Sequence, residues 1–248
     1  MNQINSNELQ AFISESVLKP FNEKRLNKIN ELTLSGILKR KNPYLFKAKN
    51  IQTSEELIKY VLDAFLSSQE ETIFGNLMEE LAIFVCEKIF NGRKAEKGKF
   101  KSIDLIFERE DKTYVVSIKS GMYWGNKDQI SEMKKNFKRA KKILTSEGET
   151  NKIIAVNGCM YGKDSKPNKK SYYKYCGQEF WKFVTGDNEF YQKIIIPLVK
   201  EAKKKDEDFK DAYYAKINEM TKEFSDKYLA SNGSIDWQKI IEYVSKKD

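Results

Sequence analysis

The spacing of hydrophobic residues divides this chain of 248 residues into helical and strand-forming segments. Apolar residues recur every three or four positions over 54–67 and 71–90, which predicts two amphipathic helices. Residues 5–40 also favour helix. The stretch 39–50 combines five cations with two aromatic residues around a proline, and it predicts a loop or a short strand.

Strand patterns occupy the middle of the chain. Two β-rich runs, 102–107 and 113–121, are joined by the charged residues 108–112, which predicts a β-hairpin. A basic amphipathic helix is predicted over 127–144, followed by an apolar strand over 152–158. Because buried strands alternate with helices, we expect an α/β fold with a mixed central sheet flanked by helices.

Helical patterns return after residue 177 and end in a last helix over 235–244. The sequence shows no internal repeat and no linker long enough to divide it, so we expect a single domain over 1–248. Within that domain we expect a helical region for DNA clamping or dimerisation, a catalytic core and a helical C-terminal part, over residues 1–70, 71–160 and 161–248.

The composition is basic, with a net charge of +9 and a pI near 9.1. This balance favours a polyanionic partner, although a lysine-rich solvated surface explains the composition equally well. Three dispersed cysteines do not suit a zinc site or a disulfide framework. The start does not resemble a signal peptide and the longest apolar run, 81–86, is far too short for a membrane span. We therefore expect a cytoplasmic protein with no membrane partner.

The chain contains no histidine, which excludes every mechanism that needs a histidine base or ligand. Acid–base chemistry must then come from Asp, Glu, Lys, Tyr or metal-bound water. No glycine-rich nucleotide-binding pattern is present, so we expect no nucleotide cofactor.

The predicted hairpin carries the most informative side chains. Asp104 opens its first strand and Lys119 stands near the end of its second. Paired strands would bring the two together, and a carboxylate beside a lysine suits Mg²⁺ binding and water activation for phosphodiester hydrolysis. Taken singly, Asp104 fits a turn cap and Lys119 fits a solvent-facing lysine equally well.

The order of these elements resembles the PD-(D/E)xK nuclease superfamily. Asp104 takes the first acid position and Ser117-Ile118-Lys119 takes the (D/E)-x-K position, while Ile103 stands where the pattern has proline. Longer words, spread over roughly residues 40–185, resemble type II restriction endonucleases of the PmeII-like family. These words are Asn42-Pro43-Tyr44-Leu45-Phe46, Glu79-Glu80-Leu81-Ala82, Ile118-Lys119-Ser120-Gly121, Trp124-Gly125-Asn126 and Ala155-Val156-Asn157-Gly158-Cys159.

The resemblance implies a restriction-endonuclease-like core and Mg²⁺-dependent, site-specific cleavage of double-stranded DNA. It implies Asp104 and the Ile118 carbonyl as metal ligands, with Lys119 orienting or deprotonating the attacking water. Ser117 replaces the usual second acid, and a hydroxyl is a poor ligand for a hard cation. The missing acid is then expected from Glu79 or Glu80 on the preceding helix, or from Glu132 on the following one. We favour the first pair because Glu132 points away from the apolar face of its helix.

DNA contacts are expected from loops beyond the strands. Candidates chosen for position and chemistry are Lys47, Lys49, Trp124, Asn126, Lys127, Gln129, Asn157 and Lys163. Trp124 fits a core anchor equally well. Cleaving both strands of a palindrome needs two active sites, so we expect a two-fold homodimer. The alternatives are a Holliday-junction or repair nuclease, and a DNA-binding protein with a decayed nuclease core.

Overall fold

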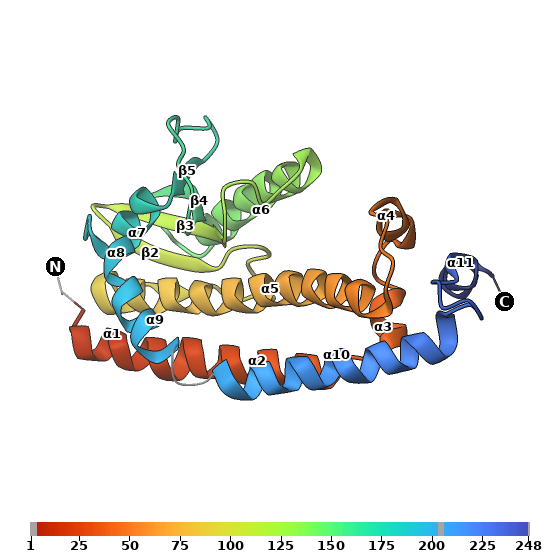
Figure 1. The fold of residues 1–248 in the computed structure, drawn as a ribbon. Coiled ribbons are helices and arrows are strands. Elements are labelled where there is room, and N and C mark those ends of the chain that lie inside the picture. Colours follow the sequence, from red (N-terminus) through yellow and green to blue (C-terminus); the bar gives the residue numbers. More distant parts are fainter. Residues whose placement is uncertain (1–3, 203–205, 248) are drawn as a thin grey trace. The chain divides into compact units, whose positions relative to one another are not determined.

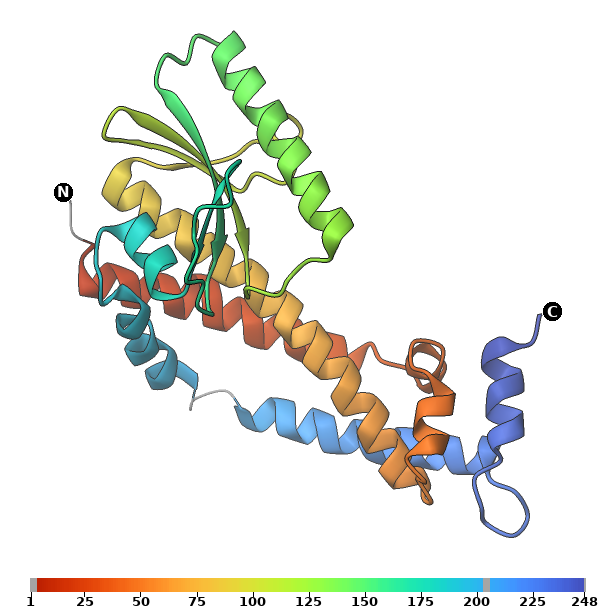
Figure 2. The same cartoon turned by 90° about the horizontal axis from the view of Figure 1, so that it is seen from above.

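The structure is a computed structural model that describes residues 4–202 and 206–247 (Figures 1 and 2). The chain packs into two compact units. The first contains the residues up to Lys19 together with Phe74–Glu201, and the second contains Pro20–Ile73 and the residues from Ala202 onward. These boundaries differ from the predicted division at residues 70 and 160. The single-domain organisation stays a prediction.

The first unit is built on a mixed sheet that, within the described residues, has five strands in the order β1-β2-β3-β4-β5. Strands β1, β2 and β3 pair antiparallel, whereas β3, β4 and β5 pair parallel. The strands are β1 Arg93–Lys94, β2 Leu105–Arg109, β3 Lys112–Lys119, β4 Lys152–Cys159 and β5 Tyr173–Cys176. Helices flank this sheet, so the predicted α/β fold is confirmed.

The hairpin between β2 and β3 turns through only two residues. Glu110 and Asp111 both have positive φ, at 52° and 54°, and Arg109 pairs directly with Lys112. Two consecutive positive φ values are typical of a type I′ turn, whose twist matches that of paired strands. The turn fixes the strand register and so determines which residues meet at the far end of the hairpin, where Asp104 precedes β2.

Helix α6 (Lys127–Ser146) confirms the basic helix predicted over 127–144. Its buried side packs with Ile106, Val115 and Ala155 of the sheet in one hydrophobic cluster. The members that α6 contributes are Met133, Phe137, Ala140 and Leu144, while Ile130 is partly buried against the same cluster.

Aromatic residues pack on the other side of the hairpin. Phe107 and Tyr114 lie in contact with each other and with Phe183 of α7 (Gln178–Thr185), at centroid distances of 5.0–5.2 Å. Phe107 also stacks on Phe90, the last residue of α5 (Ser54–Phe90). Alternate residues of β2 and β3 therefore face α6 on one side and the α5–α7 aromatics on the other. In Figure 1, the yellow C-terminal part of α5 lies below these strands, and α6 extends to their upper right.

The prediction of two helices over 54–67 and 71–90 is wrong, because α5 is continuous. The polar residues between the two patterns do not end the helix. Ser68 donates its hydroxyl to the Ala64 carbonyl at 3.1 Å, and Thr72 donates to the Ser68 carbonyl at 2.9 Å, so both hydroxyls are satisfied inside the helix. The predicted end of the second helix at residue 90 is confirmed, since Phe90 is the last helical residue and Asn91, which follows it, has a φ of 54°.

The prediction of a loop or strand over 39–50 is also wrong. Its centre forms α4 (Pro43–Ala48), because Asn42 accepts the Tyr44 N–H at the N-cap and Pro43 fits the first helical turn. The predicted N-terminal helix forms as consecutive helical segments with an interruption before Leu34. They are α1 Ser6–Phe12, the π-helical η1 Ile13–Leu18, α2 Lys19–Asn30 and α3 Leu34–Leu38.

The second unit has its own core, formed between α2, α3, α4, the first part of α5 and two C-terminal helices, α10 (Asp206–Tyr228) and α11 (Trp237–Ser245). At its edge, Arg25 pairs with Glu70 at 2.5 Å and lies 3.4 Å from the centroid of Phe209. The remaining helices of the first unit are α8 Phe190–Lys193 and α9 Ile195–Ala202. Among the described residues, no helix has the length and apolarity that crossing a membrane requires.

Candidate active site

Asp104 lies where the chain enters the hairpin, immediately before β2. Its backbone N–H donates to the Val116 carbonyl at 2.8 Å, which ties it to the strand that carries the Ser-x-Lys motif. Its Oδ2 accepts the Ile118 N–H at 2.6 Å, and 15% of the side chain is exposed. The fold therefore holds this carboxylate in a fixed position beside the end of β3.

Lys119 is the last residue of β3, and its ammonium points back toward the same place. Nζ donates to the Ile118 carbonyl at 2.7 Å and lies 3.8 Å from Oδ2 of Asp104. The acid and the lysine that the sequence placed at the two ends of the hairpin are thus brought together as a partly buried ion pair.

Glu79 is electrostatically coupled to this pair. Its pKa is raised from 4.5 to about 7, first by burial and second by the Asp104 charge, while Lys119 opposes the rise. Burial also raises the pKa of Asp104, against the lowering effects of Lys119 and of the Ile118 N–H. A second carboxylate, from α5, therefore shares the environment of the hairpin acid.

The other two candidate acids have different partners. Glu80 forms an ion pair with Lys94 of β1. Glu132, on α6, lies 3.2 Å from the Lys101 ammonium and is exposed. Sequence periodicity left Glu79 and Glu80 open, and the structure places Glu79 within the electrostatic reach of Asp104 and Lys119.

Ser117 is fully buried, and within the described part of the chain its hydroxyl has no hydrogen-bond partner. Its carbonyl accepts the side-chain amide of Asn157 at 3.2 Å, across the pairing of β3 with β4. A short neutral side chain therefore occupies the position where the superfamily pattern has an acid.

The donor set suits a hard divalent cation. The Asp104 and Glu79 carboxylates and the Ile118 carbonyl are oxygen ligands of the kind that Mg²⁺ prefers. The negative charge of Asp104 raises the pKa of Glu79. A cation between the two carboxylates would offset this repulsion. No group of three His, Cys, Asp or Glu side chains suited to a metal exists among the described residues. A complete coordination shell would therefore need the carbonyl and water.

The predicted DNA-contact residues fall into separate groups. Lys127 and Lys163 are exposed in the first unit. Lys47 and Lys49 belong to the second unit, where their ammonium groups lie over Trp237 and Tyr60.

Side-chain amides predicted to read bases are already engaged within the protein. Asn126 and Gln129 form the capping box of α6, each accepting the other's backbone N–H at 3.0 Å. Asn157 is only 1% exposed and accepts the indole N–H of Trp124 at 3.0 Å, so its side chain has no open edge for a base.

Two exposed tyrosines near the active site were missed from the sequence. Tyr123 is 90% exposed and Tyr161 is 65% exposed. The Tyr161 N–H donates to the Ser120 carbonyl, one residue beyond Lys119, and its ring lies against Gly121. The sequence between β3 and α6 carries no signal that these rings stay uncovered.

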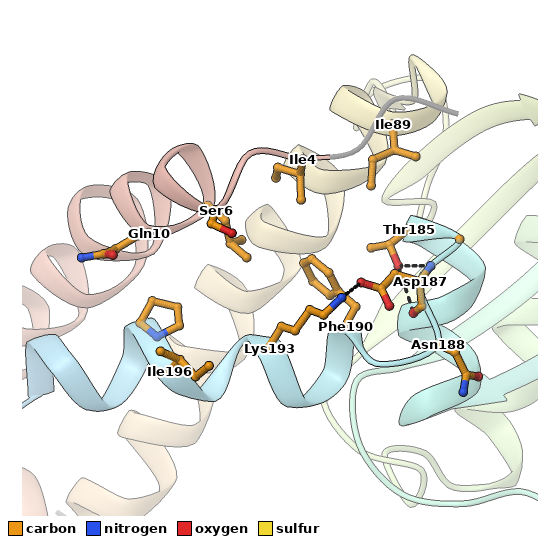
Figure 3. Close-up of a pocket in the computed structure, with 13 residues that line it drawn as sticks. Ile4, Ser6, Gln10, Ile89, Thr185, Asp187, Asn188, Phe190, Lys193 and Ile196 are labelled. Carbon is orange, nitrogen blue, oxygen red and sulfur yellow. Dashed lines mark hydrogen bonds and ion pairs between the residues drawn. The ribbon is translucent and has the colours of Figure 1, made fainter.

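A separate hollow of about 720 Å³ lies in the first unit between α1 and the α7–α9 segment (Figure 3). Its lining includes the Asp187–Lys193 ion pair, with Nζ and Oδ2 2.5 Å apart, and none of the predicted site residues. The candidate active site lies elsewhere, where β3 ends and the chain enters β2.

A mixed sheet flanked by helices, with an acid and a lysine at adjoining strand ends, defines a restriction-endonuclease-like core. The family model for type II restriction endonuclease EcoO109I matches residues 7–206. The chain therefore belongs to the EcoO109I family of type II restriction endonucleases, and it is a type II site-specific deoxyribonuclease.

This match confirms the predicted class of enzyme, while the PmeII-like assignment is not confirmed. The family implies binding to double-stranded DNA and generally uses a divalent metal. No curated protein matches the sequence.

Proposed function

We propose that this restriction endonuclease is Mg²⁺-dependent and that its active site consists of Asp104, Glu79, Lys119 and the Ile118 carbonyl. The observation that carries the proposal is the approach of the Lys119 ammonium to within 3.8 Å of Asp104, in the electrostatic field of Glu79. Glu79 supplies the acid that Ser117 lacks.

Each of these residues has a defined task in phosphodiester hydrolysis. Asp104, Glu79 and the Ile118 carbonyl would hold the cation. A bound divalent cation supplies charge stabilisation to the phosphoryl oxygens and lowers the pKa of water. Lys119 orients the attacking water and offsets the negative charge that develops on the phosphate. Its bond to the Ile118 carbonyl and its approach to Asp104 keep the ammonium in place.

The DNA would be held by residues around the strand ends. Lys127 and Lys163 are exposed cations suited to phosphate, and Tyr123 and Tyr161 present uncovered rings beside the site. We assign phosphate contacts to Lys47 and Lys49 as well.

Two copies would cut the two strands of a palindromic site as a two-fold homodimer. Because Asn157 is buried and bonded to Trp124, we propose that it positions other groups and does not read bases.

The test is cleavage of a plasmid in the presence of Mg²⁺, which should give discrete fragments. Asp104→Asn, Glu79→Gln and Lys119→Met should each lower the cleavage rate by about 100-fold or more. Glu132→Gln is the matched control, since Glu132 is an acid paired with an exposed lysine, and it should cleave at the wild-type rate. Cutting restricted to branched junctions, or binding without cutting, would contradict the proposal.

A further inference from the structure

The indole of Trp124 lies over the active-site lysine. The Lys119 ammonium is 5.6 Å from the Trp124 ring centroid, within the range of a cation–π interaction. The ammonium is therefore contacted on three sides, by the Asp104 carboxylate, the Ile118 carbonyl and an aromatic face. A lysine side chain has four rotatable bonds, so contacts of this kind decide where its charge stays.

The ring itself is anchored to the sheet. Trp124 belongs to the segment between β3 and α6, and its Nε1–H donates to Oδ1 of Asn157 at 3.0 Å. Asn157 is 1% exposed in β4, and its Nδ2 donates to the Ser117 carbonyl at 3.2 Å. Ser117 and Asn157 are direct partners in the parallel pairing of β3 with β4. A continuous chain of contacts thus runs from the strand next to the site, through the indole, to the ammonium.

We propose that Trp124 and Asn157 are positioning residues for catalysis, in which buried Asn157 fixes the indole and the indole holds the Lys119 ammonium beside Asp104. This inference rests on the proposed role of Lys119. It assigns to both residues a task within the protein in place of contact with DNA bases. The buried amide has both its ends engaged, since Oδ1 accepts from an indole N–H and Nδ2 donates to a strand carbonyl, so it is retained in the core without an unsatisfied polar group.

The proposal is tested by single-turnover cleavage and by DNA affinity measured in EDTA, on wild type and variants. Trp124→Phe keeps an aromatic ring but removes the hydrogen bond to Asn157. Asn157→Ala removes both of its side-chain hydrogen bonds, the one to the indole and the one to the Ser117 carbonyl. Each should lower the cleavage rate constant by about 3- to 30-fold, the range that a cation–π contact spans, with DNA affinity unchanged. Trp124→Leu, which has no ring, should lower the cleavage rate constant more than Trp124→Phe does.

The double variant separates positioning from independent effects. If Asn157 acts through the indole, adding Trp124→Phe to Asn157→Ala should cause no further loss. The matched control is Asn136→Ala. Asn136 is also a buried amide of the first unit, and its Nδ2 donates a bond of 3.2 Å to the Ser102 hydroxyl, which is not one of the groups that contact Lys119. This control should retain the wild-type rate constant.

The outcomes distinguish this inference from the proposed function. If Lys119→Met is inactive while Trp124→Phe and Asn157→Ala keep the wild-type rate constant, the positioning role is wrong and the active site stands. An equal loss in Asn136→Ala, or a loss that appears only as weaker DNA binding, also overturns it. If Lys119→Met cleaves normally, the proposed active site itself fails.

Discussion

The metal-free active site should be a source of instability that Glu79→Gln removes. Burial and Asp104 raise the pKa of Glu79 from 4.5 to about 7, so the folded protein disfavours the ionised carboxylate. A raised carboxyl pKa has little effect on the free energy of unfolding below pH 4.5. It reduces stability progressively as pH rises toward 7, and the full reduction is present above that value. The amide has the same shape and no charge.

The size of the effect follows from the pKa. The rise corresponds to about 3 kcal/mol at pH 8 by the usual conversion of pKa into free energy. Because the side chain is only half-buried, we reduce this to about 1–2 kcal/mol for solvent screening. For a chain of this size, that predicts an increase in Tm of about 2–8 °C.

Thermal unfolding in EDTA at pH 8 and pH 5 measures this directly. Glu79→Gln should be more stable than wild type at pH 8 and nearly equal to it at pH 5, whereas Glu80→Gln, the adjacent acid paired with Lys94, should show no such gain. Adding Mg²⁺ should raise the Tm of wild type more than that of Glu79→Gln. A variant less stable than wild type at pH 8, or equally stabilised at both pH values, would refute the reasoning.

Further predictions concern the frame around the site. Glu149 accepts the buried Thr113 hydroxyl at 2.7 Å, which lowers its pKa, so Glu149→Ala should cost about 1–2 kcal/mol in denaturant unfolding at pH 7. That difference should shrink as pH falls through the lowered pKa, since the contribution is present only while the carboxylate is ionised. Gly158→Ala would place a methyl group within 2.4 Å of the Phe180 ring and should cost about 1–3 kcal/mol, with partial recovery in the Gly158→Ala/Phe180→Leu double variant. Sedimentation of the protein on palindromic DNA should give a two-to-one complex, and a one-to-one complex would contradict the homodimer.

Local signals in the sequence predicted much of the fold. The hairpin, the amphipathic helix α6 and the end of α5 at residue 90 depend on residues close together in the chain, where periodicity and capping act directly. The strands β1 and β5 were missed because they have only two and four residues, too few to show an alternating pattern. The continuity of α5 was missed because Ser68 and Thr72 weaken a helical pattern while satisfying their own hydroxyls.

The candidate site was predictable to a similar extent. Asp104 and Lys119 follow from strand ends in one hairpin, which is a short-range relation. The choice of Glu79 over Glu80 needs the rotation of α5 about its axis relative to the sheet, which neighbouring residues on one helix cannot determine. The burial of Asn157, predicted to be a DNA contact, likewise depends on Trp124 closing over it from another segment.

The presence of Ser117 where the superfamily pattern has an acid has a mechanical consequence. Because the proposed second carboxylate, Glu79, comes from α5, a bound cation would join that helix to the hairpin through ligands about 25 residues apart in sequence. The site can then exist only while helix and sheet are docked, and opening of their interface would release the ion before either element unfolds. The ion would hold α5 and the hairpin together, so amide protons in α5 near Glu79 should exchange with deuterium more slowly when the ion is bound.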